Sequence, residues 1–397
     1  MDSKKVNDKK LQSWSEINKE RKRKKKEYKE KAIEAKKLKE MKQEVESAKN
    51  ETAKNSIEEK KEISTLSIAL PGSVLENAQT EELRAYLAGQ IARAVCLYQV
   101  DEVIVFDDYA DEDKSKATSV EDDFGFKTIR HCCGQLARIL QYLECPQYLR
   151  KHFFPIHKDL KYSGLMNPLN APHHLSSKDE SEFREGVVTN KPVKPGKGSI
   201  VYIGLRQDVH VDKLLVEGAR CTVKLHMDTM NTKKLKGIVV SPDIPRKETG
   251  IYWGYRVRLA KSLAQVFSEC PYKDGYDLTI GTSDKGSSID SFHCPSYKHA
   301  LIMFGGVQGL EFALENDQTI KENDPELIFD HYLNTLPGQG SKTIRTEEAI
   351  LISLAGLRSK LNPKFPPVSF NQNNGTNTII SPNNESIENV EDMSRFD

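Results

Sequence analysis

The first third of the chain alternates between short runs rich in apolar residues and one longer amphipathic segment. Residues 65–70 and 101–106 are apolar runs of strand length, and residues 81–97 between them carry apolar side chains at helical spacing. A strand, a helix and a second strand at this spacing form a βαβ unit, in which the two strands are parallel. Residues 132–143 and 146–154 predict two further helices. The hydrophobic pattern therefore predicts an α/β fold built on a parallel sheet.

The pattern changes between residues 182 and 259, where helical periodicity gives way to short alternating segments separated by turn residues. Several short strands in so short a segment fit a small, partly closed barrel such as the OB-fold. The predicted strands are residues 199–203, 220–225, 236–240 and 254–259. A helical pattern returns at residues 262–268, so a β-barrel insertion is predicted to interrupt the α/β domain.

Glycine-rich turns accompany three predicted strands in the last third of the chain. They are residues 281–286 after a strand at 276–280, residues 305–309 after a strand at 300–304, and residues 334–345 before a helix. Ligands of open α/β sheets bind outside the carboxyl ends of the strands, so three such turns predict one shared ligand crevice. For each turn taken alone, an ordinary βα connection is the alternative.

The last of these turns narrows the choice of ligand. Gly338 and Gly340 allow positive φ angles and a close approach of the backbone to a ligand. The tail Gly340-Ser-Lys-Thr343 resembles a phosphate-binding loop, but that motif has glycine directly before the lysine, where this chain has Ser341. The region also lacks the Gly-x-Gly-x-x-Gly of a dinucleotide-binding fold. These features favour a small ligand whose recognition does not depend on phosphate.

A helix is predicted directly after this turn. Thr346 is its predicted N-cap, and Glu347 and Glu348 lie in the first turn, where the helix dipole favours carboxylates. Its apolar face repeats at helical spacing and consists of Ile350, Leu354, Leu357 and Leu361. The glycine turn is therefore predicted to be held between a strand and a well-anchored helix.

The charges are distributed unevenly, although the formal net charge of the 397 residues is only +1. Residues 1–61 hold 21 Lys and Arg against 13 Asp and Glu, and the remaining residues hold 38 against 45. The run from Arg21 to Lys26 fits a nuclear import signal or a contact with nucleic-acid phosphates, and equally a solvated helix of mixed charge. The tail from Asn362 is rich in Asn, Pro and Ser, and we expect it to be disordered.

Composition argues against several classes of protein. The seven cysteines form no C-x-x-C pair and lie mostly among apolar neighbours, which favours reduced, buried thiols over disulfides or zinc ligands. His173 and His174 lack further ligands at matching spacing, so no metal site is predicted. No segment is apolar enough to cross a membrane, and the N-terminus lacks an apolar secretory signal. We therefore expect a protein of the nucleus or cytosol.

Several separated segments together resemble the SPOUT-class RNA methyltransferases, and more narrowly their eukaryotic and archaeal branch with an OB-fold insertion. The motifs, in order, are Leu66-Ser-Ile-Ala-Leu-Pro-Gly-Ser73, Asn167-Pro-Leu-Asn-Ala-Pro-His-His174, Phe183-Arg-Glu-Gly-Val187, Tyr252-Trp-Gly-Tyr255, Gly305-Gly-Val-Gln-Gly-Leu-Glu311 and residues 334–349. The resemblance divides the chain into five parts. They are a basic, helical or disordered extension (1–61), the first part of the SPOUT domain (62–181), the OB-fold-like insertion (182–259), the second part of the SPOUT domain (260–361) and the tail (362–397).

The resemblance implies a deep trefoil knot at the carboxyl end of the sheet, S-adenosylmethionine as the cofactor, and a homodimer. Animal members are described as ribosomal RNA uridine-N3 methyltransferases and as spindle- or kinetochore-associated proteins. The implied substrate is therefore ribosomal RNA, and the implied location is the nucleus or nucleolus. A non-catalytic RNA-binding or spindle-associated scaffold that retains the knot is the alternative. By motif, the cofactor would contact Thr282, Lys285, Gly286, Gly305, Gly306, Asn334, Thr335, Gly338, Gly340, Ser341 and Ile344.

Methylation of uridine N3 requires the acceptor nitrogen to lie in line with the methyl group and to lose its proton. Arg345 and Glu347 follow the cofactor loop and are the candidate catalytic residues, with an ion pair and a helix-dipole partner as the alternative roles. Asp107 and Asp108 are weaker candidates. The candidate RNA-binding residues are Tyr252, Trp253, Tyr255, Arg256 and Arg258. An aromatic core with an exposed basic face is the alternative for this last set.

Overall fold

The computed structural model describes residues 64–109, 129–193, 196–230, 232 and 234–361. These residues form two compact units, and each is described by itself. The first, the α/β unit, contains the described residues up to Glu144 together with residues 156–169 and the chain from Gly254 onward. The second, the barrel unit, contains residues 145–155 and 170–253.

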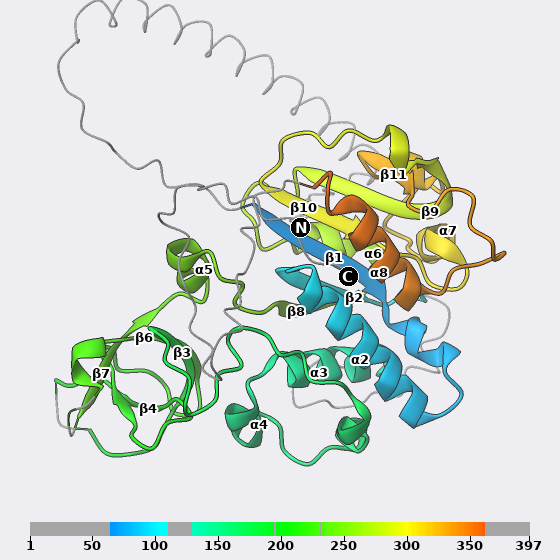
Figure 1. Ribbon diagram of the computed structural model, residues 1–397. Helices are drawn as coiled ribbons and strands as arrows, with labels where there is room; N and C mark the ends of the chain where they lie inside the picture. The colour runs from blue at the N-terminus through cyan, green and yellow to red at the C-terminus, as the bar shows by residue number, and fades with distance from the viewer. Residues whose placement is uncertain (1–63, 110–128, 194–195, 231, 233, 362–397) are drawn as a thin grey trace, which may run out of the picture. The chain divides into compact units, whose positions relative to one another are not determined.

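The α/β unit is built on a parallel sheet of six strands in the order β11-β9-β10-β1-β2-β8 (Figure 1). The strands are β1 (Thr65–Pro71), β2 (Glu102–Phe106), β8 (Arg256–Ala260), β9 (Leu278–Ser288), β10 (His299–Met303) and β11 (His331–Asn334). In the middle of the sheet, Ile68 of β1 lies opposite Val103 of β2 and Ile302 of β10. The α/β fold with a parallel sheet, predicted from the sequence, is therefore confirmed.

The central strands are buried on both faces, as the crossover helices of a parallel sheet require. All five residues of β2 are buried, and in β1 only Thr65 is partly exposed. Continuous apolar strands of this kind are typical of parallel sheets covered by helices on both sides. The covering helices are α2 (Glu81–Leu97), α3 (His131–Glu144), α6 (Leu263–Ser268), α7 (Gly309–Glu315) and α8 (Thr346–Leu357). Short 3-10 helices lie at Gly72–Asn77, Lys158–Leu160, Ser163–Leu165, Ile289–Ser291 and Pro325–Leu327.

Helix α2 has the bounds that the sequence predicts. The Thr80 hydroxyl accepts a hydrogen bond from the backbone N–H of Leu83 at 3.3 Å, which caps the first turn. Its buried face carries mostly small and branched apolar residues, including Ala88, Ile91 and Val95. The first βαβ unit is therefore specified locally, by a cap and by helical periodicity.

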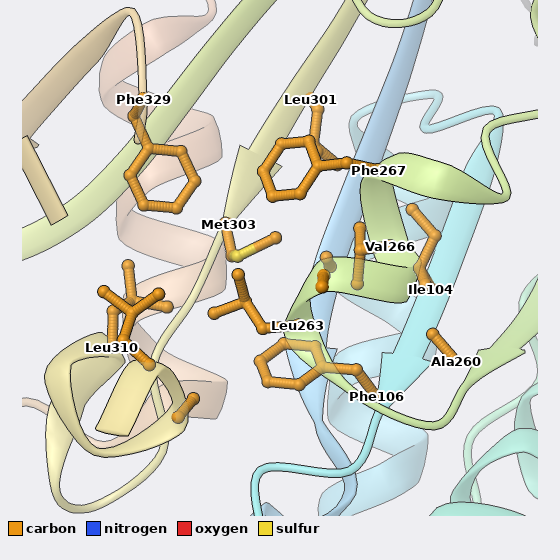
Figure 2. Close-up of a cluster of buried hydrophobic side chains, with 14 of the residues drawn as sticks. Ile104, Phe106, Ala260, Leu263, Val266, Phe267, Leu301, Met303, Leu310 and Phe329 are labelled. Carbon is orange, nitrogen blue, oxygen red and sulfur yellow. The ribbon is translucent and has the colours of Figure 1, made fainter. Parts of the chain in front are cut away.

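One hydrophobic cluster fixes the carboxyl half of the sheet to α6 and α7. Figure 2 shows Ile104 and Phe106 of β2, Leu301 and Met303 of β10, Leu263 of α6 and Leu310 of α7 pointing into the same cluster. Full burial of such a side chain stabilises the fold by about 1.5–3 kcal/mol. Because these residues lie near the ends of β2 and β10, the loops that follow these strands leave from a rigid base.

The barrel unit contains a closed barrel of five strands in the order β3-β4-β5-β7-β6. The strands are β3 (Phe183–Val188), β4 (Ile200–Tyr202), β5 (Val209–His210), β6 (Arg220–Leu225) and β7 (Leu235–Val240), with helices α4 (Gln147–Phe153) and α5 (Ile244–Thr249) and a 3-10 helix at Met227–Thr229. Val201, Val209 and Val223 lie at the centre of its core and are fully buried. The barrel strands β4, β6 and β7 overlap the predicted strands at 199–203, 220–225 and 236–240, whereas β3, whose six residues are all buried, and the two-residue β5 were not predicted as strands.

The prediction that residues 254–259 belong to the barrel is wrong. These residues lead into β8, which pairs in parallel with β2 at the edge of the six-stranded sheet. Alternation did not distinguish the two sheets, because an edge strand has one partly exposed face like a barrel strand. The partner of Arg258 is decisive: its Nε donates to Glu102 Oε1 of β2 at 2.9 Å.

Several predictions concern residues outside the described ranges. These are the helical or disordered extension of residues 1–61, the basic run at 21–26 and the disordered tail from residue 362. Across the described part of the chain, no helix combines the length and the apolar composition that a membrane span requires.

Candidate functional site

The three predicted glycine turns converge at the carboxyl edge of the sheet, where β11, β9 and β10 are neighbours. The Thr282 hydroxyl donates to the Met303 carbonyl at 2.9 Å, which ties the first turn to the end of β10. Asn334 Nδ2 donates to the Asp284 carbonyl at 2.9 Å and ties the third turn to the first. The Thr346 hydroxyl donates to the Gly305 carbonyl at 3.0 Å and ties the third turn to the second. The turns thus form one interconnected wall.

The first turn departs from the prediction, because β9 does not end at Ile280 but continues to Ser288. Its register against β11 jumps, however, since Gly281 lies opposite Tyr332 and Ser287 lies opposite Leu333. Residues 282–286 therefore bulge out of the ladder. A β-bulge of this kind redirects side chains at a sheet edge, as a turn would do.

Two of the predicted ligand glycines have a packing role. A Cβ on Gly286 would lie 2.6 Å from the backbone carbon of Leu333. A Cβ on Gly305 would lie 2.6 Å from the backbone carbon of Gly309 at the start of α7. Neither position has room for a side chain, so close packing of backbone on backbone alone requires glycine there.

The two glycines of the third turn, Gly338 and Gly340, lie in open space instead. Gly338 has a φ of 74°, as predicted, and a Cβ at this position would meet no atom within 4 Å. Gly340 is equally open, but it is absent from the residues with positive φ, so the predicted backbone conformation is wrong at Gly340. Its neighbour Ser341 donates its hydroxyl to the Thr343 carbonyl at 2.7 Å, and this local bond shapes the second half of the turn.

The helix after the turn begins one residue earlier than predicted. Arg345 is the N-cap of α8, and Thr346 is its first helical residue. The Glu348 carboxylate accepts a hydrogen bond from the Arg345 backbone N–H at 3.0 Å, which is half of a capping box. Local sequence rules assign Thr346 to the N-cap, but its hydroxyl makes a long-range hydrogen bond to Gly305 instead.

The two candidate catalytic residues lie at this helix start. The Arg345 side chain is exposed and Glu347 is half-buried. One carboxylate oxygen of Glu347, Oε2, is buried and has no hydrogen-bond partner among the described residues. Lys285, a predicted cofactor contact, instead pairs with Glu311 of α7 at 2.7 Å. Roles of Arg345 and Glu347 in the reaction stay predictions.

A carboxylate that the sequence ranked lower also lies beside one of the glycine turns. Asp108 follows β2 and accepts a hydrogen bond from the Ser73 hydroxyl at 2.5 Å. A Cβ on Gly306 would lie 3.2 Å from Asp108 Oδ2 and 3.3 Å from Ser73 Oγ. Burial raises the pKa of Asp107, and it raises that of Asp108 to about 6. Two acidic residues at a strand end were the only sequence feature that indicated this group.

The candidate RNA-binding aromatic residues form part of the core, so the prediction that they stack on bases is wrong for this arrangement. Tyr252, Trp253 and Tyr255 are 2%, 9% and 4% exposed. Trp253 Nε1 donates to Glu185 Oε1 at 2.7 Å, and the Tyr255 hydroxyl donates to the Leu140 carbonyl at 2.9 Å. The aromatic rings reach buried acceptors that the sequence does not reveal. The alternative of an aromatic core was correct.

Of the two basic residues in that set, only Arg256 is exposed. Arg258 turns inward to Glu102, and its Nη2 also donates to the Tyr276 hydroxyl at 3.1 Å.

The seven cysteines are free thiols, of which Cys132, Cys133 and Cys145 are buried. His173 is also buried, and its ring contacts His174 edge to face at 4.5 Å.

The chain is similar in sequence to known RNA methyltransferases. A family described as "Putative RNA methyltransferase" matches residues 65–357. A protein of Mus musculus named 28S rRNA (uridine-N(3))-methyltransferase is 56% identical over 299 residues, covering 75% of this chain and 77% of the mouse protein. A protein of the same name from Drosophila melanogaster is 51% identical over 368 residues, covering 90% of this chain and 75% of the fly protein.

The human protein of that name is 55% identical over 299 residues, covering 75% of this chain and 78% of its own length. The matched residues 65–357 include every strand of the parallel sheet and all three turns at its carboxyl edge. The chain therefore belongs to this family of RNA methyltransferases.

Proposed function

We propose that this protein transfers a methyl group from S-adenosylmethionine to N3 of a uridine in large-subunit ribosomal RNA. The convergence of the three turns at one sheet edge, in a chain of the RNA methyltransferase family, carries the proposal. The three animal relatives named above act, by their names, on uridine N3 of 28S rRNA. Ribosomal RNA is therefore the proposed substrate.

The residues at this edge fit a small cofactor that carries no phosphate. The third turn leaves open space beside Gly338 and Gly340, and Thr335 and Asn334 nearby are only partly buried. Backbone groups and small polar side chains suit adenosine and an amino acid, and no cluster of cations for a phosphate is needed. Residues proposed to hold the cofactor are Thr282, Lys285, Gly286, Gly305, Gly306, Asn334, Thr335, Gly338, Gly340, Ser341 and Ile344.

Bound S-adenosylmethionine supplies an electrophilic methyl group on a sulfonium. The protein therefore needs no nucleophile of its own, and its residues act by holding the uridine in line with that group. They must also accept the N3 proton and exclude water from the developing anion. Arg345 at the start of α8 is proposed to face this anion.

Transfer of the methyl group to ribosomal RNA by the purified protein tests the proposal. Ribosomal RNA that lacks the modification is incubated with the protein and S-adenosylmethionine, and modified nucleosides are identified by mass spectrometry. We expect 3-methyluridine, and its position is then mapped by primer extension. Calorimetric titration with S-adenosylmethionine alone is the companion measurement. Absence of both binding and 3-methyluridine would refute the proposal.

We further propose that the chain forms a homodimer through α2 and α8, which pack against each other. Leu83, Tyr86 and Leu97 of α2 are 53%, 46% and 57% exposed, and Leu351 of α8 is 44% exposed. Apolar side chains exposed on adjacent helices are typical of surfaces that bind another protein. On the basis of the family resemblance, we also propose that the chain forms a trefoil knot at the cofactor edge and that the barrel is an OB-fold.

The remaining proposals concern location and domain limits. A nuclear or nucleolar location is supported by the basic run at 21–26 and by a ribosomal RNA substrate. The same resemblance supports association with the spindle or kinetochore. It also supports limits at residues 61 and 361, whereas the predicted limits at 181 and 259 are replaced by those of the barrel unit, which contains residues 170–253.

A further inference from the structure

Three loops meet around one hydrogen bond at the carboxyl edge of β1, β2 and β10. Ser73 follows β1, Asp108 follows β2 and Gly306 follows β10. The Ser73 hydroxyl donates to Asp108 Oδ2 at 2.5 Å. A Cβ on Gly306 would lie within 3.2 Å of that carboxylate oxygen and 3.3 Å of the hydroxyl. The pair therefore lies directly beside the turn at the end of β10, and the absent side chain of Gly306 keeps the approach open.

Asp108 is almost fully buried although its carboxylate is only partly hydrogen-bonded. It is 5% exposed, and its second oxygen, Oδ1, has no hydrogen-bond partner among the described residues. A buried carboxylate oxygen without a partner destabilises a fold, so its presence points to a use outside stability. Ser73, in contrast, is partly exposed. The hydroxyl is thus the accessible end of the pair, and the carboxylate is the inner end.

The surroundings of the pair keep the carboxylate basic, and burial is the largest cause. Asp107, beside it in sequence, also opposes its ionisation, whereas Arg130 before α3 favours it, and the buried Cys133 of α3 interacts with the same carboxylate. Burial raises the pKa of Asp108 to about 6. A proton acceptor works best when its pKa lies near the working pH, and an ordinary carboxylate falls well below that range.

We propose that Ser73 and Asp108 form a relay that removes the N3 proton of the uridine. This inference rests on the proposed function. As the N3 lone pair bonds to the methyl carbon and the bond from carbon to sulfur breaks, the N3 proton passes to Ser73 Oγ. The hydroxyl proton of Ser73 passes at the same time to Asp108 Oδ2. Neutral 3-methyluridine and a neutral thioether remain, and the protonated Asp108 returns its proton to water through Ser73.

The first test replaces the carboxylate without changing its size. For Asp108→Asn, we expect kcat to fall by about 10²-fold or more at neutral pH, with the Kd for S-adenosylmethionine within about threefold of the wild type. The rate of the variant should rise about tenfold per pH unit between about pH 7 and pH 9, because only uridine already ionised in solution can then react. The wild-type rate should be nearly flat in that range and fall below about pH 6.

The second test addresses the hydroxyl. Ser73→Ala should show the same loss of kcat and the same dependence on alkaline pH, whereas Ser73→Thr, which retains a hydroxyl, should restore at least about a tenth of the wild-type rate. Asp277→Asn is the matched control, because this carboxylate accepts from the His299 N–H at 2.7 Å at the opposite end of the sheet. Its kcat and pH profile should match the wild type.

The outcomes separate the relay from the proposed function. Wild-type protein that makes no 3-methyluridine refutes both. Active wild-type protein whose Asp108→Asn and Ser73→Ala variants keep kcat within about threefold refutes the relay alone. If circular dichroism shows that Asp108→Asn does not fold, two measurements still test the relay: kcat of Ser73→Ala and the wild-type rate at acid pH. A wild-type rate that is flat down to about pH 5 overturns the relay.

Discussion

At the scale of single residues, the site combines positions fixed by packing with positions left open. Gly286 and Gly305 are glycines because the backbone of a neighbouring strand or helix occupies the space of a side chain. Gly338 and Gly340 face no such neighbour. The sequence pattern predicted all four, yet it could not separate these two reasons, since close packing between distant segments leaves no local trace in the sequence.

The open glycine with a left-handed backbone offers the sharpest test of the cofactor loop. Valine at Gly338 would be strained by its β-branch at a φ of 74° and would narrow the loop, so S-adenosylmethionine binding should be abolished. Calorimetric titration measures the affinity, and circular dichroism should show an intact fold. Gly218→Val is the matched control, with a φ of 76° and equal space in the barrel unit. Unchanged affinity of Gly338→Val for S-adenosylmethionine would show that the cofactor pocket lies elsewhere.

Trp253 tests the assignment of the aromatic residues to the core. Glu185, which is 3% exposed, accepts from Trp253 Nε1 at 2.7 Å and also from Thr222 and Arg220. Trp253→Phe removes one of these donors and should lower the free energy of unfolding by about 1–3 kcal/mol, measured by urea denaturation.

The affinity of the same variant for RNA distinguishes the two interpretations of Trp253. A buried ring does not stack on bases, so Kd should stay within about twofold of the wild type. Weaker RNA binding with unchanged stability would restore the stacking role.

At the scale of elements, the most informative departure from prediction is β8. Its alternation of polar and apolar residues fits a barrel strand and an edge strand of a parallel sheet equally well, so the sequence could not assign it. The position was decided by a buried network in which Glu102 accepts from Ser67, Tyr276 and Arg258. These residues come from β1, from the segment before β9 and from β8, and their proximity depends on the tertiary fold.

Removal of the cation from this network should have a large cost. Arg258→Ala leaves the carboxylate of Glu102, which is 5% exposed, without its ion pair at 2.9 Å. We expect the free energy of unfolding to fall by about 3–5 kcal/mol. Urea denaturation measures the change, and Lys261→Ala, at an exposed position after β8, should change stability by no more than about 0.5 kcal/mol. A small effect of Arg258→Ala would show that the hydrogen bonds from Ser67 and Tyr276 are enough to stabilise the buried carboxylate of Glu102.

The exposed apolar residues of α2 and α8 make the dimer proposal testable. Leu97→Glu places a charge on a face that is proposed to be covered by a second copy, and we expect the variant to be monomeric. Sedimentation velocity measures the association state. Glu76→Gln, which alters an exposed residue outside α2 and α8, should remain dimeric. Wild-type protein that is monomeric at every concentration tested would refute the proposal.

At the scale of the whole molecule, the sequence predicted a parallel sheet and a β-barrel, and both are present. It did so because burial on two faces and burial on one face produce different patterns, continuous in β2 and alternating over residues 235–238 of β7. The order of strands was beyond reach, since β9 lies between β10 and β11 although it precedes both in the chain. The relay was also hidden, because Ser73, Asp108 and Gly306 are separated by more than two hundred residues at their extremes.

The strand order has a consequence for synthesis of the chain. β1 and β2 are the first of the described strands to leave the ribosome, yet their outer neighbours are β10 (His299–Met303) and β8 (Arg256–Ala260). Until those segments have been translated, both edges of the β1–β2 pair are without their native partners, and unpaired edges promote aggregation. The nascent protein must therefore survive the translation of the whole barrel unit as an incomplete sheet, and ribosome-bound chaperones should be needed most in that interval.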